Sequence, residues 1–122
     1  MKTKTTDTKA EAVFPPPPVA ASKLLVPITS WPEMFREETT TGVEFDEFWY
    51  ESIEQDVAYF FRWLGEPRAT VLVVWDNEGF THVECRKIGD LLLSTTESMP
   101  IITELGRAFR KTGFATAKNK LH

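Results

Sequence analysis

The sequence has few of the residues from which enzymes build active sites. Its 122 residues include one cysteine, Cys85, and two histidines, His82 and His122. A single cysteine excludes an internal disulfide and a zinc site made of cysteines. Cys85 and His82 are three positions apart in an expected strand, so their side chains would lie on opposite faces of a sheet. We therefore predict no catalytic residues and a protein that is not an enzyme.

Sites for metals, nucleotides and membranes lack their usual signatures as well. The six glycines are scattered along the chain and do not form a phosphate-binding loop. The acidic residues match neither a calcium-binding loop nor a zinc-binding helix. No stretch approaches the ~18 apolar residues of a membrane span, and the N-terminus lacks the apolar segment of a signal peptide. We expect no cofactor, no metal and no membrane partner, and a soluble, cytoplasmic protein.

Charge is plentiful but unevenly distributed. The net charge is −4, which argues against a protein that coats nucleic acid. From Glu33 to Asp56 there are nine carboxylates and one arginine, a local charge of −8. After Glu104 the chain has five basic residues and no acidic one. This asymmetry predicts separate acidic and basic surfaces.

The N-terminal part differs in composition from the rest of the chain. Residues 1–22 consist mainly of Thr, Lys, Ala and Pro, and they offer little to bury. We predict a disordered arm over residues 1–22 that stiffens into polyproline II at its prolines. A single folded domain is expected over residues 23–113, followed by a basic tail over residues 114–122.

The arm contains an aromatic residue and a run of prolines: Phe14, Pro15, Pro16, Pro17, Pro18. This stretch resembles the ligand motif of EVH1 domains, in which an aromatic anchor precedes a polyproline II segment. The resemblance implies that Phe14 would insert into an aromatic groove of such a partner. A stiff spacer is the alternative, because proline-rich linkers have the same composition.

Apolar periodicity predicts a short first helix and a long second helix. Ser30 and Glu33 form a capping box, which indicates a helix that ends near Glu38. Apolar residues then recur at helical spacing over residues 43–64, with Asp56 at the centre of the apolar side. The other side of this expected helix is acidic: Glu44, Glu47, Glu51, Glu54.

A hairpin is the clearest β-structure in the sequence. Residues 70–75 and 80–86 are rich in β-branched residues, and a turn separates them. The expected register places Val71 opposite Cys85 and Trp75 opposite Thr81, with these side chains facing the core. The other face is mixed and could contact a partner: Leu72, Val74, Phe80, His82.

The C-terminal third is less clear in its first part. We predict a third strand over residues 91–95, since a lone hairpin is marginally stable, and a short helix capped by Asp90 is the alternative. Ser98 precedes a last helix, expected over residues 99–111. Basic residues gather on the end of this helix and on the tail: Arg107, Arg110, Lys111, Lys118, Lys120.

Together these elements predict an α+β fold. A small antiparallel sheet of two to three strands would carry the long amphipathic helix and the C-terminal helix on one face. The leading hypothesis for function is a non-enzymatic protein-interaction module (an adaptor, inhibitor or accessory factor) that uses the acidic helix face and the mixed sheet face. The partner would be another protein, or a second copy of this chain in a homodimer. Two alternatives stay open: an accessory nucleic-acid binder that uses the basic C-terminal end, and an acidic inhibitor that mimics DNA.

Overall fold

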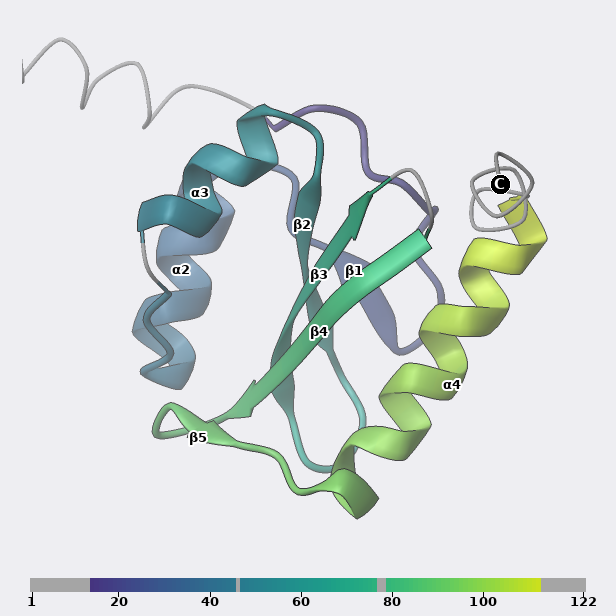
Figure 1. Ribbon diagram of the computed structural model, residues 1–122. Helices are drawn as coiled ribbons and strands as arrows, with labels where there is room; N and C mark the ends of the chain where they lie inside the picture. Colours follow the sequence, from purple (N-terminus) through teal and green to yellow (C-terminus); the bar gives the residue numbers. More distant parts are fainter. Residues whose placement is uncertain (1–13, 46, 77–78, 113–122) are drawn as a thin grey trace, which may run out of the picture.

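A five-stranded antiparallel sheet forms the centre of the computed structural model, which describes residues 14–45, 47–76 and 79–112 (Figure 1). The strands lie across the sheet in chain order, from β1 at one edge to β5 at the other. The α+β class is confirmed, but the sheet has five strands where two to three were expected. In the described ranges, no helix has the length and apolarity that a bilayer span requires. The elements are β1 (Leu25–Pro27), α2 (Trp31–Thr41), α3 (Glu47–Glu54), β2 (Ala58–Trp63), β3 (Ala69–Asp76), β4 (Gly79–Lys87), β5 (Leu91–Leu92) and α4 (Thr95–Thr112).

Helices cover both faces of the sheet (Figure 1). On one face, Phe60 of β2 packs against Phe45 and against Tyr50 of α3, with ring centroids 4.7 and 5.7 Å apart. On the other face, Trp75 of β3 contacts Phe109 of α4 at 6.5 Å. The expectation that the helices share one face is therefore wrong. The central strands are buried along both sides, so each side of the sheet needs its own cover.

The long helix expected over residues 43–64 is instead a short helix followed by a strand. α3 has eight residues, and Asp56 beyond it has a left-handed backbone with φ of 64°. The N–H of Asp56 donates to the carbonyl of Ile53, and the N–H of Val57 donates to that of Ser52, which is a Schellman ending. Asp56 is thus exposed at a turn and does not lie within an apolar face. The apolar residues of β2 fit helical spacing as well, because a strand that is buried on both faces is apolar without alternation.

The first helix is longer than expected because its stop signal lies at Gly42. Ser30 caps the start of α2 by accepting a hydrogen bond from the N–H of Glu33 at 3.3 Å. Gly42 has φ of 76°, and its N–H donates to the carbonyl of Glu38 at 2.8 Å. A left-handed residue at this position satisfies the last helical carbonyls. The helix therefore runs on to Thr41.

Pairing of β3 with β4 confirms the first part of the predicted register. Val71 lies opposite Cys85, as expected. A register shift then places Trp75 opposite Phe80, where Thr81 was expected. The shift is the effect of a β-bulge, which adds one residue to one strand and is not visible in an alternating pattern.

The chain after β4 forms a shorter strand and an earlier helix than expected. β5 has two residues, whereas a strand over residues 91–95 was predicted. Ser94 and Glu97 form a capping box: the N–H of Glu97 donates to Ser94 Oγ at 3.1 Å, and the N–H of Ser94 donates to Glu97 Oε1 at 2.9 Å. α4 therefore begins at Thr95, one turn before the start that was expected after Ser98.

The segment of residues 14–22 packs on the domain and does not extend away from it. Phe14 is 6% exposed, and its N–H donates to the carbonyl of Thr29 at 2.9 Å. The hydroxyl of Tyr59 donates to the carbonyl of Pro15 at 2.7 Å. This part of the expected arm belongs to the folded domain, which corrects the boundary placed at residue 23. The structure does not describe two expected segments: residues 1–13 of the arm and residues 114–122 of the tail.

Candidate protein-interaction surface

Three rings form a continuous aromatic surface where α3 meets β4. We call Phe48, Trp49 and His82 the aromatic platform. Phe48 is 60% exposed, and its ring meets that of Trp49 edge-on at 4.8 Å. Trp49 stacks on His82 at 5.9 Å, with the two ring planes 6° apart. Because His82 comes from a strand and the other two from a helix, the platform exists only when α3 is docked on the sheet.

Carboxylates line one side of this platform. Glu47, Glu51 and Glu54 are exposed on α3 at positions i, i+4 and i+7, so they share one side of the helix. Glu51 lies one turn from Phe48. Within the described residues, Glu51 and Glu54 form no ion pair. The structure thus brings three of the four expected acidic residues together, and it leaves Glu44 exposed in the loop before α3.

Tyr50 and Glu38 form a half-buried hydrogen-bonded pair between α3 and α2. The hydroxyl of Tyr50 donates a hydrogen bond to the carboxylate of Glu38, which joins α3 to α2. The pKa of Glu38 is raised by burial and by the charge of Glu44, while the hydrogen bond acts in the opposite direction. Burial and the Glu38 carboxylate also raise the pKa of Tyr50. The carboxylates of Glu38 and Glu44 are thus close enough to interact, and two neighbouring negative charges favour cations at this end of α2.

The expected sheet-face site is divided between the interior and the surface. Leu72 is 0% exposed, because this face of the sheet lies under α2 and α3. Val74 is half-buried, and His82 is the exposed member that joins the aromatic platform. The side chain of Phe80 lies outside the described part of the chain. A partner can therefore reach His82 but not Leu72.

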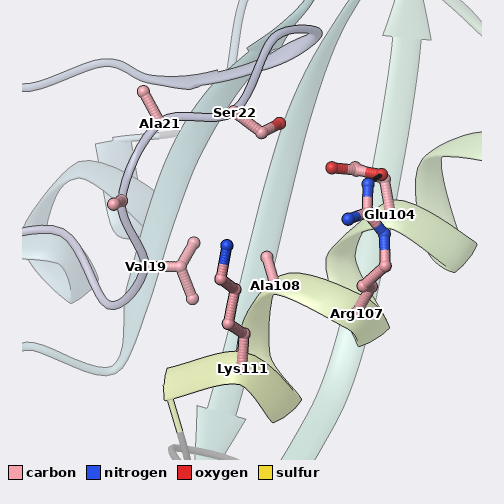
Figure 2. Close-up of a pocket in the computed structure, with 8 residues that line it drawn as sticks. Val19, Ala21, Ser22, Glu104, Arg107, Ala108 and Lys111 are labelled. Carbon is pink, nitrogen blue, oxygen red and sulfur yellow. Dashed lines mark hydrogen bonds and ion pairs between the residues drawn. The ribbon is translucent and has the colours of Figure 1, made fainter.

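The expected basic surface offers few free cations. On α4, Arg107 pairs with Glu104, while Arg110 and Lys111 are exposed and form no ion pair with a described residue. Figure 2 shows the Lys111 side chain beside a pocket of about 200 Å³ between residues 19–22 and α4. Two free cations provide a weak basis for phosphate binding, whose strength grows with the number of contacts. The remaining members of the set, Lys118 and Lys120, lie beyond the described residues.

The aromatic residue of the proline-rich stretch is a core residue. The ring of Phe14 contacts the rings of Trp31 and Tyr59 edge-on, at 5.1 and 6.1 Å. An EVH1-type ligand needs this ring exposed to its partner, and a spacer needs it free of the domain. Neither condition holds, so the stretch serves chiefly to pack residues 14–18 on the fold.

The residues considered for nucleophilic or metal chemistry are not arranged for it. Cys85 is 5% exposed, and burial raises the pKa of its thiol to about 11. The thiol is thus protonated at neutral pH and a poor nucleophile. In the described part of the chain, no three His, Cys, Asp or Glu side chains converge as metal ligands would.

Sequence reasoning missed the aromatic platform, although it included each of its residues. Phe48 and Trp49 lie within residues 43–64, where the expected long helix would turn its apolar residues toward the core. The real α3 buries Ser52 and Ile53, which leaves Phe48 at its exposed edge. The pairing of Trp49 with His82 joins residues 33 positions apart, and no local pattern signals such a contact.

The chain was also compared with known proteins. No family model matches it, and no similar protein is found among curated proteins or solved structures. Its function is therefore inferred from the chemistry of the surface that α3 and β4 form.

Proposed function

We propose that this protein is a non-enzymatic protein-interaction module that binds its partner at the aromatic platform and the neighbouring α3 carboxylates. One observation carries the proposal: Phe48 is 60% exposed one turn from Glu51, and Glu51 and Glu54 of α3 have no cationic partner among the described residues. The partner surface would combine an apolar pocket for the Phe48 ring with lysine or arginine side chains.

The apolar part of this surface supplies the larger share of the binding energy. Full burial of a phenylalanine side chain is worth about 1.5–3 kcal/mol. Clustered aromatic residues are also frequent hot spots of protein interfaces. Trp49 is already held by its stack on His82, so little side-chain entropy would be lost when a partner covers it.

The carboxylates supply specificity and association rate. Complementary charge steers the encounter of two proteins and weakens as salt is added. Glu51 and Glu54 are exposed, so they would act at the rim of the contact. We therefore expect a partner with a basic surface, and an association rate that falls with ionic strength.

The two alternatives receive less support. From Glu47 to Glu54 the carboxylate row spans about 10 Å, the length of roughly three phosphate steps on one strand of DNA. A row of this length would imitate only a small part of the phosphate backbone that a DNA-binding protein contacts. At the basic end of α4, two cations have no acidic partner among the described residues. Two cations are too few to support a nucleic-acid-binding surface.

The test isolates the partner with the full chain and then measures its affinity for defined variants. Phe48→Ser should weaken binding about 30-fold or more, the loss expected for a hot-spot residue. Glu51→Lys with Glu54→Lys should slow association and reverse its salt dependence. The matched control is Ile102→Ser, because Ile102 is 46% exposed but lies on α4 at the other face of the sheet.

Two results would contradict the proposal. One is a partner whose affinity is unchanged by Phe48→Ser and by the double lysine variant. The other is a partner that Phe48→Ser and the Ile102→Ser control weaken equally, which would show that the loss is not specific to the aromatic platform.

A further inference from the structure

Beside the buried apolar residues of α2, Trp31 and Met34, the same helix carries a polar row that lines a pocket. A helix that packs on a sheet normally turns its apolar residues at i, i+3, i+4 and i+7 toward the core. A second row of α2 at the same spacing is charged and polar, and it lies beside two arginines, Arg62 of β2 and Arg68 just before β3. Together they line a pocket of about 180 Å³: Glu33, Arg36, Glu37, Thr40, Arg62, Arg68.

One wall of this pocket is a closed hydrogen-bonded unit. The carboxylate of Glu37, 2% exposed, accepts hydrogen bonds from the guanidinium of Arg68 at 2.6 and 3.0 Å. It also accepts one from the buried hydroxyl of Thr70. The negative charge of Glu37 is therefore balanced by the positive charge of Arg68. Arg68 also donates a hydrogen bond to the carbonyl of Ala69 at 2.7 Å.

The other wall carries unused positive charge. Arg62 lies on β2 opposite Thr70, and its Nε is buried without a hydrogen-bond partner among the described residues. Neither Arg36 nor Arg62 forms an ion pair with a described residue. Glu33 is partly engaged, because its Oε1 accepts hydrogen bonds from the N–H and the hydroxyl of Thr29 at 2.9 and 3.3 Å.

The charge count of the pocket is positive. Three arginines and two glutamates line it, which leaves a surplus of one positive charge. A buried donor that lacks an acceptor is costly, and most such donors in proteins are satisfied. Guanidinium groups present a planar fork of donors that matches the oxygens of a carboxylate or a phosphate.

We propose that this pocket binds a small oxyanion, a carboxylate or phosphate group, between Arg62 and Arg36. Arg62 is half-buried and provides one buried donor, its Nε, while Arg36 on α2 is exposed and closes the site from the solvent side. The Thr40 hydroxyl lines the pocket and supplies a neutral donor. Arg68 does not take part in binding the anion, because its guanidinium is already bonded to Glu37 and to the carbonyl of Ala69.

The test follows the Nε–H resonance of Arg62 by NMR while inorganic phosphate or acetate is added to the full chain. Sodium chloride at matched ionic strength is the reference. A saturable shift with phosphate or acetate supports the site, and the stronger of the two identifies the preferred oxyanion. Arg36→Gln should weaken binding about tenfold, as expected for one charge-assisted hydrogen bond. Arg110→Met, an exposed arginine on α4, should leave it unchanged.

The melting temperature provides a second measurement, so the test does not depend on the Arg62 resonance alone. Phosphate should raise the melting temperature of the wild type and of Arg110→Met more than sodium chloride does, and this gain should vanish in Arg62→Met. Shifts equal to those caused by sodium chloride, or an equal response in all variants, would overturn the proposal. Binding through Phe48 is a separate property, so Arg36→Gln should leave partner affinity at the aromatic platform unchanged.

Discussion

Asp56 is the residue on which the shape of the helical layer depends. Its left-handed backbone, with φ of 64°, ends α3 and turns the chain directly into β2. Left-handed backbone costs a typical L-residue about 1–2 kcal/mol, and Asp pays less because its short side chain is compatible with that region. Glycine is the usual residue at such a position.

We predict that Asp56→Gly raises the free energy of unfolding slightly, by about 0.5 kcal/mol. Relief of the left-handed strain should outweigh the larger chain entropy of glycine in the unfolded state. Asp56→Ala should instead lower it by about 1 kcal/mol, because alanine lacks the short polar side chain with which Asp tolerates a left-handed backbone. Urea denaturation of the three proteins measures both changes. A continuous helix through this position would give the opposite order, with alanine the most stable.

At the scale of elements, the segment of residues 14–22 acts as part of the core. Phe14 packs edge-on against Trp31 at the start of α2 and against Tyr59 of β2, so it joins a helix to the sheet. The prolines that follow it limit the freedom of the unfolded chain, which lowers the entropic cost of placing Phe14 there.

Replacement of Phe14 should therefore behave as a core substitution. We expect Phe14→Ala to lower the free energy of unfolding by about 3 kcal/mol, the usual cost of truncating a buried phenylalanine. Phe48→Ala, at an exposed phenylalanine, should change it by no more than about 0.5 kcal/mol. Chemical denaturation measures both. Equal, small effects would show that the segment is dispensable for the fold.

At the scale of the whole molecule, buried polar contacts join the helical layer to the sheet. Glu37 of α2 receives hydrogen bonds from Arg68 and from Thr70 of β3. Because Glu37 and Thr70 are buried, these hydrogen bonds fix the position of α2 on the sheet and also stabilise its packing there.

Loss of this connection should be costly for the fold. We predict that Glu37→Ala lowers the free energy of unfolding by about 2–3 kcal/mol, because the Thr70 hydroxyl and part of Arg68 lose their buried partner. Glu104→Ala is the control: its partner Arg107 is 65% exposed, so the change should stay near 0.5 kcal/mol. Thermal and urea unfolding would separate the two variants. Equal costs would mean that Glu37 is solvated in solution.

Capping and pairing were predictable where the signal is local. Ser30 sets the start of α2, and Val71 lies opposite Cys85, as the sequence indicated. The end of α3 was not predictable in this way, since Asp56 has no side-chain feature that demands a left-handed turn. The carboxylates of the candidate site were predictable from the sequence. Its aromatic surface was not, because the contact between His82 and Trp49 forms only in the folded protein.

The sequence by itself determined the α+β class, the acidic and basic segments, and the start of α2, because each follows from composition or from residues a few positions apart. Only the tertiary structure decided that the apolar residues of β2 form a strand, that Phe14 is interior, and that Phe48 is exposed. The reason is the same in each case. A run of apolar residues is compatible with a buried helix or a buried strand, and only the element packed against it determines which side chains are covered.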